Sequence, residues 1–118
     1  MQFLTYDPNF DPTAEMAPPT PEMMAEMDVF ITEAIQSGAI IATGALQPQG
    51  TRLKLTNGAF TVTDGPFIEL KELMAGFAVI QAETLEEAIE VCKRFRKIVG
   101  DGETEIVRLF TPDEMGQA

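Results

Sequence analysis

The hydrophobic residues of this chain follow two patterns that alternate along its length. Short apolar runs typical of strands occur at 3–6, 39–46 and 77–82. Between these runs, residues 21–37 and 85–99 carry apolar side chains at the spacing of an amphipathic helix. The pattern therefore predicts an α+β protein in which strands and helices are interleaved.

Polar residues at the helix ends support these boundaries. Thr20 is an expected N-cap with Pro21 at the first helical position, and Gly38 is an expected stop. The segment Thr84–Glu87 has the sequence of a capping box, in which a threonine hydroxyl and a glutamate carboxylate bind backbone N–H groups of the first turn. Gly100 closes the second helix.

Two further segments read as a β-hairpin. Thr51–Leu55 and Phe60–Thr63 flank Asn57-Gly58, a pair that accepts the positive φ angles of a type I′ turn. We expect Asp64–Phe67 to break the chain after this hairpin, because glycine and proline adjoin there.

A last strand is predicted at 105–110. The complete order is a ferredoxin-like βαββαβ fold with an inserted β-hairpin, in one domain over residues 1–118. We expect a Pro-rich loop at 8–20 and a frayed acidic tail from Asp113.

The strands at 39–46 and 77–82 are apolar on both faces, as in strands buried on both sides. Two helices can cover only one face of a four-stranded sheet. We therefore expect a homodimer that packs sheet against sheet; the alternative is a monomer whose hairpin or Pro-rich loop covers the second face.

The composition narrows the function classes. A net charge of −11 from 8 basic and 19 acidic residues disfavours direct nucleic-acid and membrane-surface binding. No long apolar run or signal-peptide pattern occurs, so we expect a cytoplasmic protein. Histidine is absent and Cys92 is the single cysteine, which excludes Cys-His metal sites and Ser-His or Cys-His nucleophilic pairs within this chain. We expect Cys92 to be buried and inert, and we expect neither metal nor cofactor.

The densest group of chemically useful side chains follows the hairpin. Pro66 fixes the backbone there, and in an extended segment Glu69 and Lys71 project to the same side. The candidate ligand-binding residues are Asp64, Phe67, Glu69, Lys71 and Glu72. The alternative reading is a structural turn in which Asp64 caps backbone N–H groups and Glu69 and Lys71 form a surface ion pair.

This motif resembles the signature of DGPF-type proteins, a branch of the YCII-related family. The resemblance extends to Gly44–Pro48 and to Gly76-Phe77, and it covers the chain except the Pro-rich loop and the tail. It implies a dimeric α+β barrel with a cleft between sheet and helices, and an association with extracytoplasmic-function sigma factors. Some YCII-like relatives are thought to use a His-Asp pair with the His on the first helix, where this chain has Met27 near the expected position.

Two functions follow as expectations. The first is a non-catalytic module that binds a small anionic molecule or a regulatory protein partner, and the missing His favours it. The second is a small lyase or isomerase in which Asp64 or Glu69 acts as general base and Lys71 stabilises an oxyanion. Between enzyme and module, we lean towards no enzymatic activity.

Overall fold

The structure is a computed structural model that describes residues 1–9, 19–46, 49–67 and 76–116. Its elements in chain order are β1 (Gln2–Tyr6), α1 (Pro21–Ser37), β2 (Ile40–Ala45), β3 (Gln49–Thr56), β4 (Ala59–Phe67), β5 (Gly76–Gln81), α2 (Leu85–Val99) and β6 (Glu105–Leu109). The predicted α+β class and the predicted positions of both helices are confirmed. Within the described ranges, no helix is long and apolar enough to cross a membrane.

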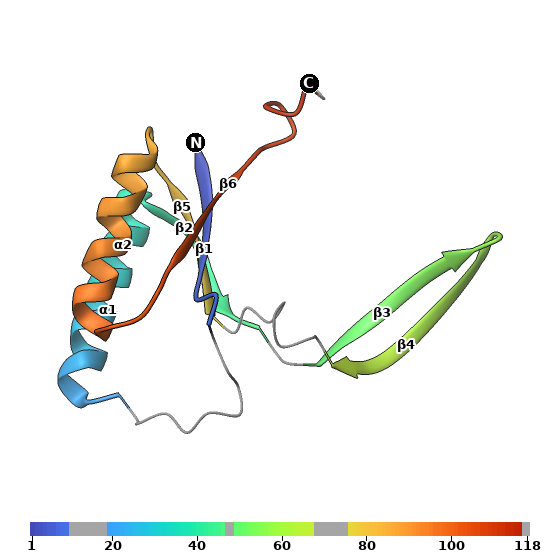
Figure 1. Ribbon diagram of the computed structural model, residues 1–118, viewed down its shortest axis with the longest axis horizontal. Helices are drawn as coiled ribbons and strands as arrows, with labels where there is room; N and C mark the ends of the chain where they lie inside the picture. Colours follow the sequence, from blue (N-terminus) through green and yellow to red (C-terminus); the bar gives the residue numbers. More distant parts are fainter. Residues whose placement is uncertain (10–18, 47–48, 68–75, 117–118) are drawn as a thin grey trace.

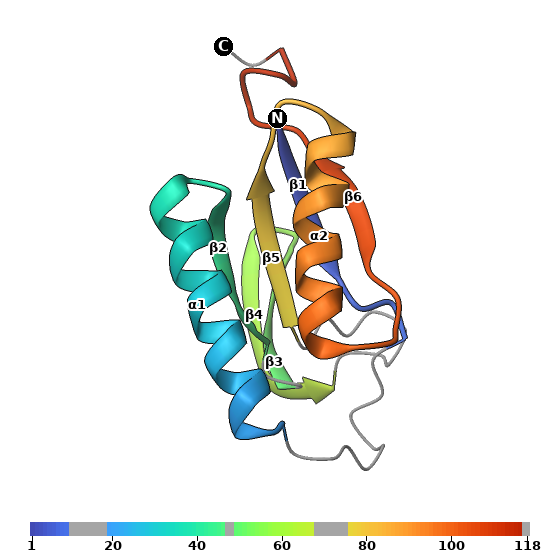
Figure 2. The ribbon, with the colours of Figure 1, turned by 90° about the vertical axis from the view of Figure 1, so that its left-hand side faces the viewer.

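Strands β2, β5, β1 and β6 form one antiparallel sheet in that order. Phe3 in β1 stands opposite Ile80 in β5 and Arg108 in β6, so these three residues share one face. Both helices lie on that face of the sheet (Figure 2). This arrangement is a ferredoxin-like α+β fold.

Side-chain caps fix where the helices begin. The Thr20 hydroxyl accepts a hydrogen bond from the Met23 N–H at 3.1 Å, and the Thr84 hydroxyl accepts one from the Glu87 N–H at 3.2 Å. The Glu87 carboxylate accepts from the Glu83 N–H at 2.9 Å, one residue before the cap. The predicted capping residues are therefore confirmed. The one difference is that the Glu87 carboxylate binds the N–H of Glu83, not an N–H of the first helical turn.

The core consists of two clusters between the sheet and the helices. The first contains Phe3, Ile80, Ala82, Ala88 and Cys92, and the second contains Phe30, Ala34 and Ile40. The burial expected for Cys92 is confirmed. Both clusters lie on the helix side, and among the described residues no second layer covers the other face of the sheet.

Strands β3 and β4 form a separate two-stranded antiparallel sheet. Asn57 and Gly58 join them with φ angles of 51° and 80°, the positive values that the Asn-Gly pair tolerates. The pair projects on the side of the four-stranded sheet that faces away from the helices (Figure 1). From 51 to 64, each residue is exposed.

The predicted break at Asp64–Phe67 is wrong. β4 continues through Phe67, and its pairing with β3 shifts between Thr51↔Asp64 and Gln49↔Phe67. β4 therefore carries one extra residue in this interval, as in a β-bulge. Proline is tolerated in such a place because it need not donate a ladder hydrogen bond there.

The prediction that 39–46 is buried on both faces is also wrong for a single chain. β2 is an edge strand of the sheet, and only its first residue, Ile40, is buried. The described residues cover one face of the sheet, the helix side, so an apolar sequence is not enough to bury both faces of a strand.

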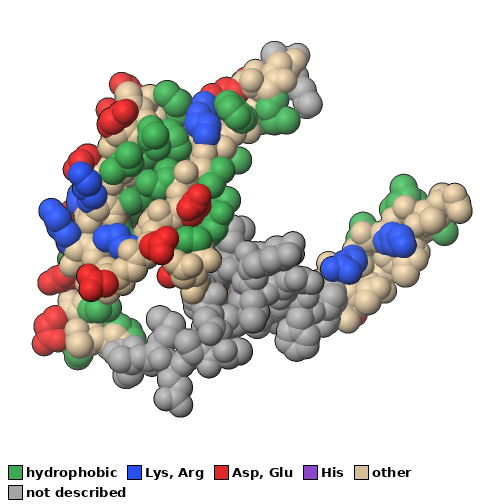
Figure 3. All heavy atoms as spheres, in the orientation of Figure 1, with side chains coloured by type: hydrophobic (Ala, Val, Ile, Leu, Met, Phe, Trp, Pro, Cys, Tyr) green, Lys and Arg blue, Asp and Glu red, His purple; other side chains and the backbone are tan. Residues whose placement is uncertain are grey.

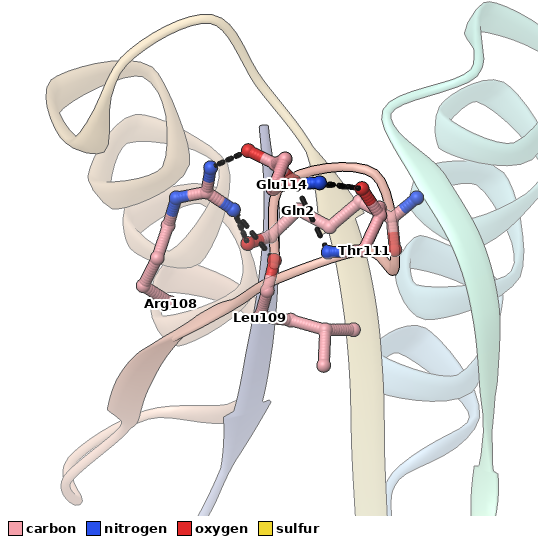
Figure 4. Close-up of polar contacts among 5 residues, drawn as sticks. All are labelled: Gln2, Arg108, Leu109, Thr111 and Glu114. Carbon is pink, nitrogen blue, oxygen red and sulfur yellow. Dashed lines mark hydrogen bonds and ion pairs between the residues drawn. The ribbon is translucent and has the colours of Figure 1, made fainter. Parts of the chain in front are cut away.

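Residues 112–116 form turns beyond the end of β6, and the fraying expected from Asp113 stays a prediction. Arg108 forms an ion pair with Glu114, and the Thr111 N–H donates to the Glu114 carboxylate at 3.1 Å (Figure 4). The Arg108 guanidinium also donates to the Gln2 carbonyl at 3.2 Å. Hydrogen bonds from Arg108 and, to a lesser extent, from Thr111 lower the pKa of Glu114 to about 2.

Candidate functional site

A cleft of about 450 Å³ lies between the helix-covered face of the sheet and the two helices. Most of its lining residues are apolar or aromatic, which is typical of small-molecule sites. The apolar lining consists of Met27, Phe30 and Ile31 from α1, Ile40, Phe77, Ala78 and Ile80 from the sheet, and Val91, Phe95 and Val99 from α2.

Two threonines contribute to the floor of the cleft. The Thr5 hydroxyl donates to the Ala78 carbonyl at 3.1 Å, and the Thr43 hydroxyl donates to the Phe77 carbonyl at 2.9 Å. Both hydroxyl protons are thus used by carbonyls of β5. Thr5 is 6% exposed, yet it introduces no unpaired donor into the cleft.

Helix α2 supplies a thiol and a cation to the lining. Burial raises the pKa of Cys92, and the charge of Arg96 acts in the opposite direction but more weakly. The thiol therefore stays protonated at neutral pH and is a poor nucleophile. This agrees with the inert role expected for Cys92.

Arg96 fixes the loop at the end of the cleft. Its Nε donates to the Thr104 hydroxyl at 2.8 Å and its Nη2 donates to the Glu103 carbonyl at 2.9 Å. The guanidinium carbon lies 5.2 Å from the centre of the Phe95 ring, within cation–π range. Gly102, with φ +150°, leaves the space that the guanidinium occupies, because a Cβ there would collide with Nη1.

Three further polar residues line the same cleft. Tyr6 is the last residue of β1, Asp7 directly follows it, and Asp101 comes from the loop after α2. Tyr6 stands opposite Phe77 and Glu105 in the sheet register, so β1 ends where β5 and β6 begin. The polar lining is therefore concentrated at one end of the sheet.

The buried polar groups are satisfied. Across the described ranges, each buried side-chain nitrogen or oxygen has a hydrogen-bond partner. No group of three or more His, Cys, Asp or Glu side chains is arranged to hold a metal ion in these ranges. The cleft thus offers apolar surface without an orphaned polar group that would demand a charged ligand.

The structure places one of the five predicted site residues. Asp64 is exposed in β4, where its carboxylate accepts a hydrogen bond from the Thr51 hydroxyl at 3.1 Å, and it is not among the residues that line the cleft. The side chain of Phe67 and the residues Glu69, Lys71 and Glu72 lie outside what the structure describes, so their role as a site stays a prediction.

Sequence reasoning missed the polar residues of the cleft, Asp7, Arg96 and Asp101 among them. Asp7 is far from Arg96 and Asp101 in the sequence, and it shares a cleft with them only because α2 packs against the sheet that contains β1. One signal was available: Arg96 follows the apolar stripe of α2, four residues after the buried Cys92 and thus one turn further along the helix.

Comparison with known proteins identifies the class. The family model for the YCII-related domain matches residues 1–111, and the chain belongs to this family. The predicted YCII-related resemblance is thereby confirmed. A search of the curated proteins gives no match.

Among solved structures, the chain is similar to a 5-chloro-2-hydroxyhydroquinone dehydrochlorinase from Burkholderia phenoliruptrix, solved in complex with 2,5-dihydroxybenzoquinone. The two sequences are 16% identical, the match covers 93% of this chain and 94% of the other, and the TM-score is 0.45.

Proposed function

We propose that this YCII-related protein is a non-catalytic binding module whose cleft takes a small molecule with one or two aromatic or aliphatic rings. The observation that carries this proposal is an apolar cleft of about 450 Å³ whose buried polar groups are already paired. Such a surface gains free energy by releasing water, without needing a complementary charge deep inside.

The ligand's polar substituents face the end of the cleft lined by Tyr6, Asp7, Arg96 and Asp101. Arg96 is already held in place by Thr104 and Glu103, so little side-chain entropy is lost when it contacts a ligand. An anionic or phenolic group next to this guanidinium is the favoured arrangement.

The alternative function is a lyase or isomerase. Its support is that two carboxylates, Asp7 and Asp101, line the same cleft as Arg96, which is the residue set needed for a general base and an oxyanion partner. Because the chain has no histidine, one of these two carboxylates is the proposed general base. Solvent deuterium that enters a bound ring compound over time favours this function; unchanged ligand favours the binding module.

We also propose a homodimer in which the uncovered sheet faces pack together. The alternation in β1 and β6 puts Leu4, Val107 and Leu109 on the face away from the helices, and Val79 of β5 pairs with Leu4 on that face. Val107 and Leu109 are 42% and 38% exposed in the single chain. A second copy covers this apolar face by closing the two sheets into a barrel.

The binding proposal is tested by filling the cleft. Met27 lines it from α1, and Met27→Trp puts an indole into the space. We expect this variant to weaken binding of hits from a library of one- and two-ring aromatic compounds by about tenfold or more, as seen by ligand-observed NMR.

Met24→Trp is the matched control, because Met24 lies on the same helix but is 59% exposed and does not line the cleft. Hits that bind both variants as well as they bind the unmodified protein contradict the proposed site. A library without hits contradicts the binding function itself.

A further inference from the structure

The hairpin β3–β4 has one apolar face that its own chain leaves uncovered. Leu53 pairs with Val62, and Leu55 pairs with Phe60, so these four side chains share a face. They are 59–69% exposed. The register puts Arg52 and Lys54 on the opposite face. Basic side chains on the hairpin are visible in Figure 3.

A two-stranded hairpin alone in water is at best marginally stable, so this apolar row needs a partner surface. β3 and β4 make their main contacts with each other, and each described residue from 51 to 64 is exposed. An exposed apolar row of this kind on an acidic protein marks an interaction surface.

We infer that the hairpin is an arm that packs its apolar row against a second copy of this chain. It projects on the side of the four-stranded sheet that faces away from the helices (Figure 1). A copy seated on that sheet face therefore lies beside the arm. The inference rests on the sheet-to-sheet dimer proposed above and adds a second contact to it.

Charge favours the same partner. Segment 49–67 contains Arg52, Lys54 and the single acid Asp64, a net charge of +1. The whole chain carries −11, so the remaining residues, 1–48 and 68–118, carry −12. We call these remaining residues the body. A cationic arm is attracted to the acidic body of another copy, whereas two acidic bodies without arms repel each other.

The size of the contact is adequate. Covering four large apolar side chains removes on the order of 400 Å² per arm, and two exchanged arms with the surfaces they cover bury roughly 1,600 Å². That area is typical of a stable complex. The arms thus add a second contact area to the interface formed by the two sheet faces.

The test combines light scattering with hydrogen exchange of the full chain at a series of dilutions. We expect a dimer in which amides 51–64 are protected, with the protection lost in step with dissociation. The paired variant Leu55→Ser with Phe60→Ser should raise the dimer dissociation constant about tenfold or more and expose the arm amides.

The matched control is Met24→Ser with Val29→Ser on α1. These two side chains are 59% and 57% exposed, close to the arm residues, and they should leave the dissociation constant within about twofold. Arg52→Ser with Lys54→Ser should weaken the dimer and reduce its dependence on salt.

The outcomes separate the two proposals. A dimer whose arm amides exchange freely keeps the sheet interface and overturns the arm. Arm protection that does not change with dilution means the arm is held by its own chain and also overturns the inference. A monomer at all concentrations overturns both the arm and the sheet dimer.

Discussion

The body and the hairpin of this protein use the same kinds of side chain with opposite results. Ile80 in β5 is 2% exposed between the sheet and the helices, whereas Leu55 in β3 is 59% exposed. Both stand in regular antiparallel ladders with apolar neighbours. Strand pairing therefore does not bury a side chain; a second layer does, and among the described residues such a layer covers the body but not the hairpin.

The largest expected effect is a difference between the body and the hairpin in how much a large-to-small substitution lowers the free energy of unfolding. Ile80→Ala should cost about 3 kcal/mol of unfolding free energy, because it leaves a cavity in the first core cluster. In dilute solution, where the arm has no partner, Leu55→Ala should cost within about 0.5 kcal/mol. Urea denaturation measures both. Equal costs would mean that another part of the same chain packs against the hairpin.

An intermediate effect concerns the turn of the hairpin. Gly58 has φ +80°, and Gly58→Val forces a β-branched residue into that region at a cost of roughly 1–3 kcal/mol to the hairpin. The body shares few contacts with the turn, so its denaturation midpoint should not move. Backbone NMR shifts of 51–64 should become random-coil while those of α2 stay in place. A lower midpoint for the whole protein would contradict independent stability.

The smallest effect lies at the end of β6. The folded pKa of Glu114, about 2, is below its ordinary value of 4.5, so its pairing with Arg108 contributes stability that is fully present above pH 4.5. This contribution is lost as the pH falls through about 2. An NMR titration of the Glu114 carboxyl carbon should show the lowered midpoint, and Glu114→Gln should leave residues 112–116 frayed. A midpoint near 4.5 would contradict the ion pair with Arg108 and would favour the fraying from Asp113 that the sequence predicts.

Local signals in the sequence were enough to predict much of this fold. Thr20, Thr84 and Asn57-Gly58 act through neighbouring backbone groups, so their effect is readable within a few residues. Arg108 shows the limit: it binds Glu114 and reaches the carbonyl of Gln2 at the other end of the chain.

The site was harder to predict than the elements. Asp64–Phe67 looked like a turn because glycine and proline are turn residues, but a bulge in β4 accommodates them. The cleft combines Thr5, Arg96 and Asp101, which come together only after β1, α2 and the loop beyond it have packed. No spacing rule links residues placed by the sheet order, so tertiary structure was needed to find them.

The most direct test of this account is a chemical-shift map of the ¹⁵N-labelled protein with an aromatic compound bound. The account predicts shifts at Ala78, Phe95 and Arg96 around the cleft, and none along 51–64 of the hairpin. Shifts confined to the hairpin, or spread evenly over the surface, would contradict a ligand site between sheet and helices.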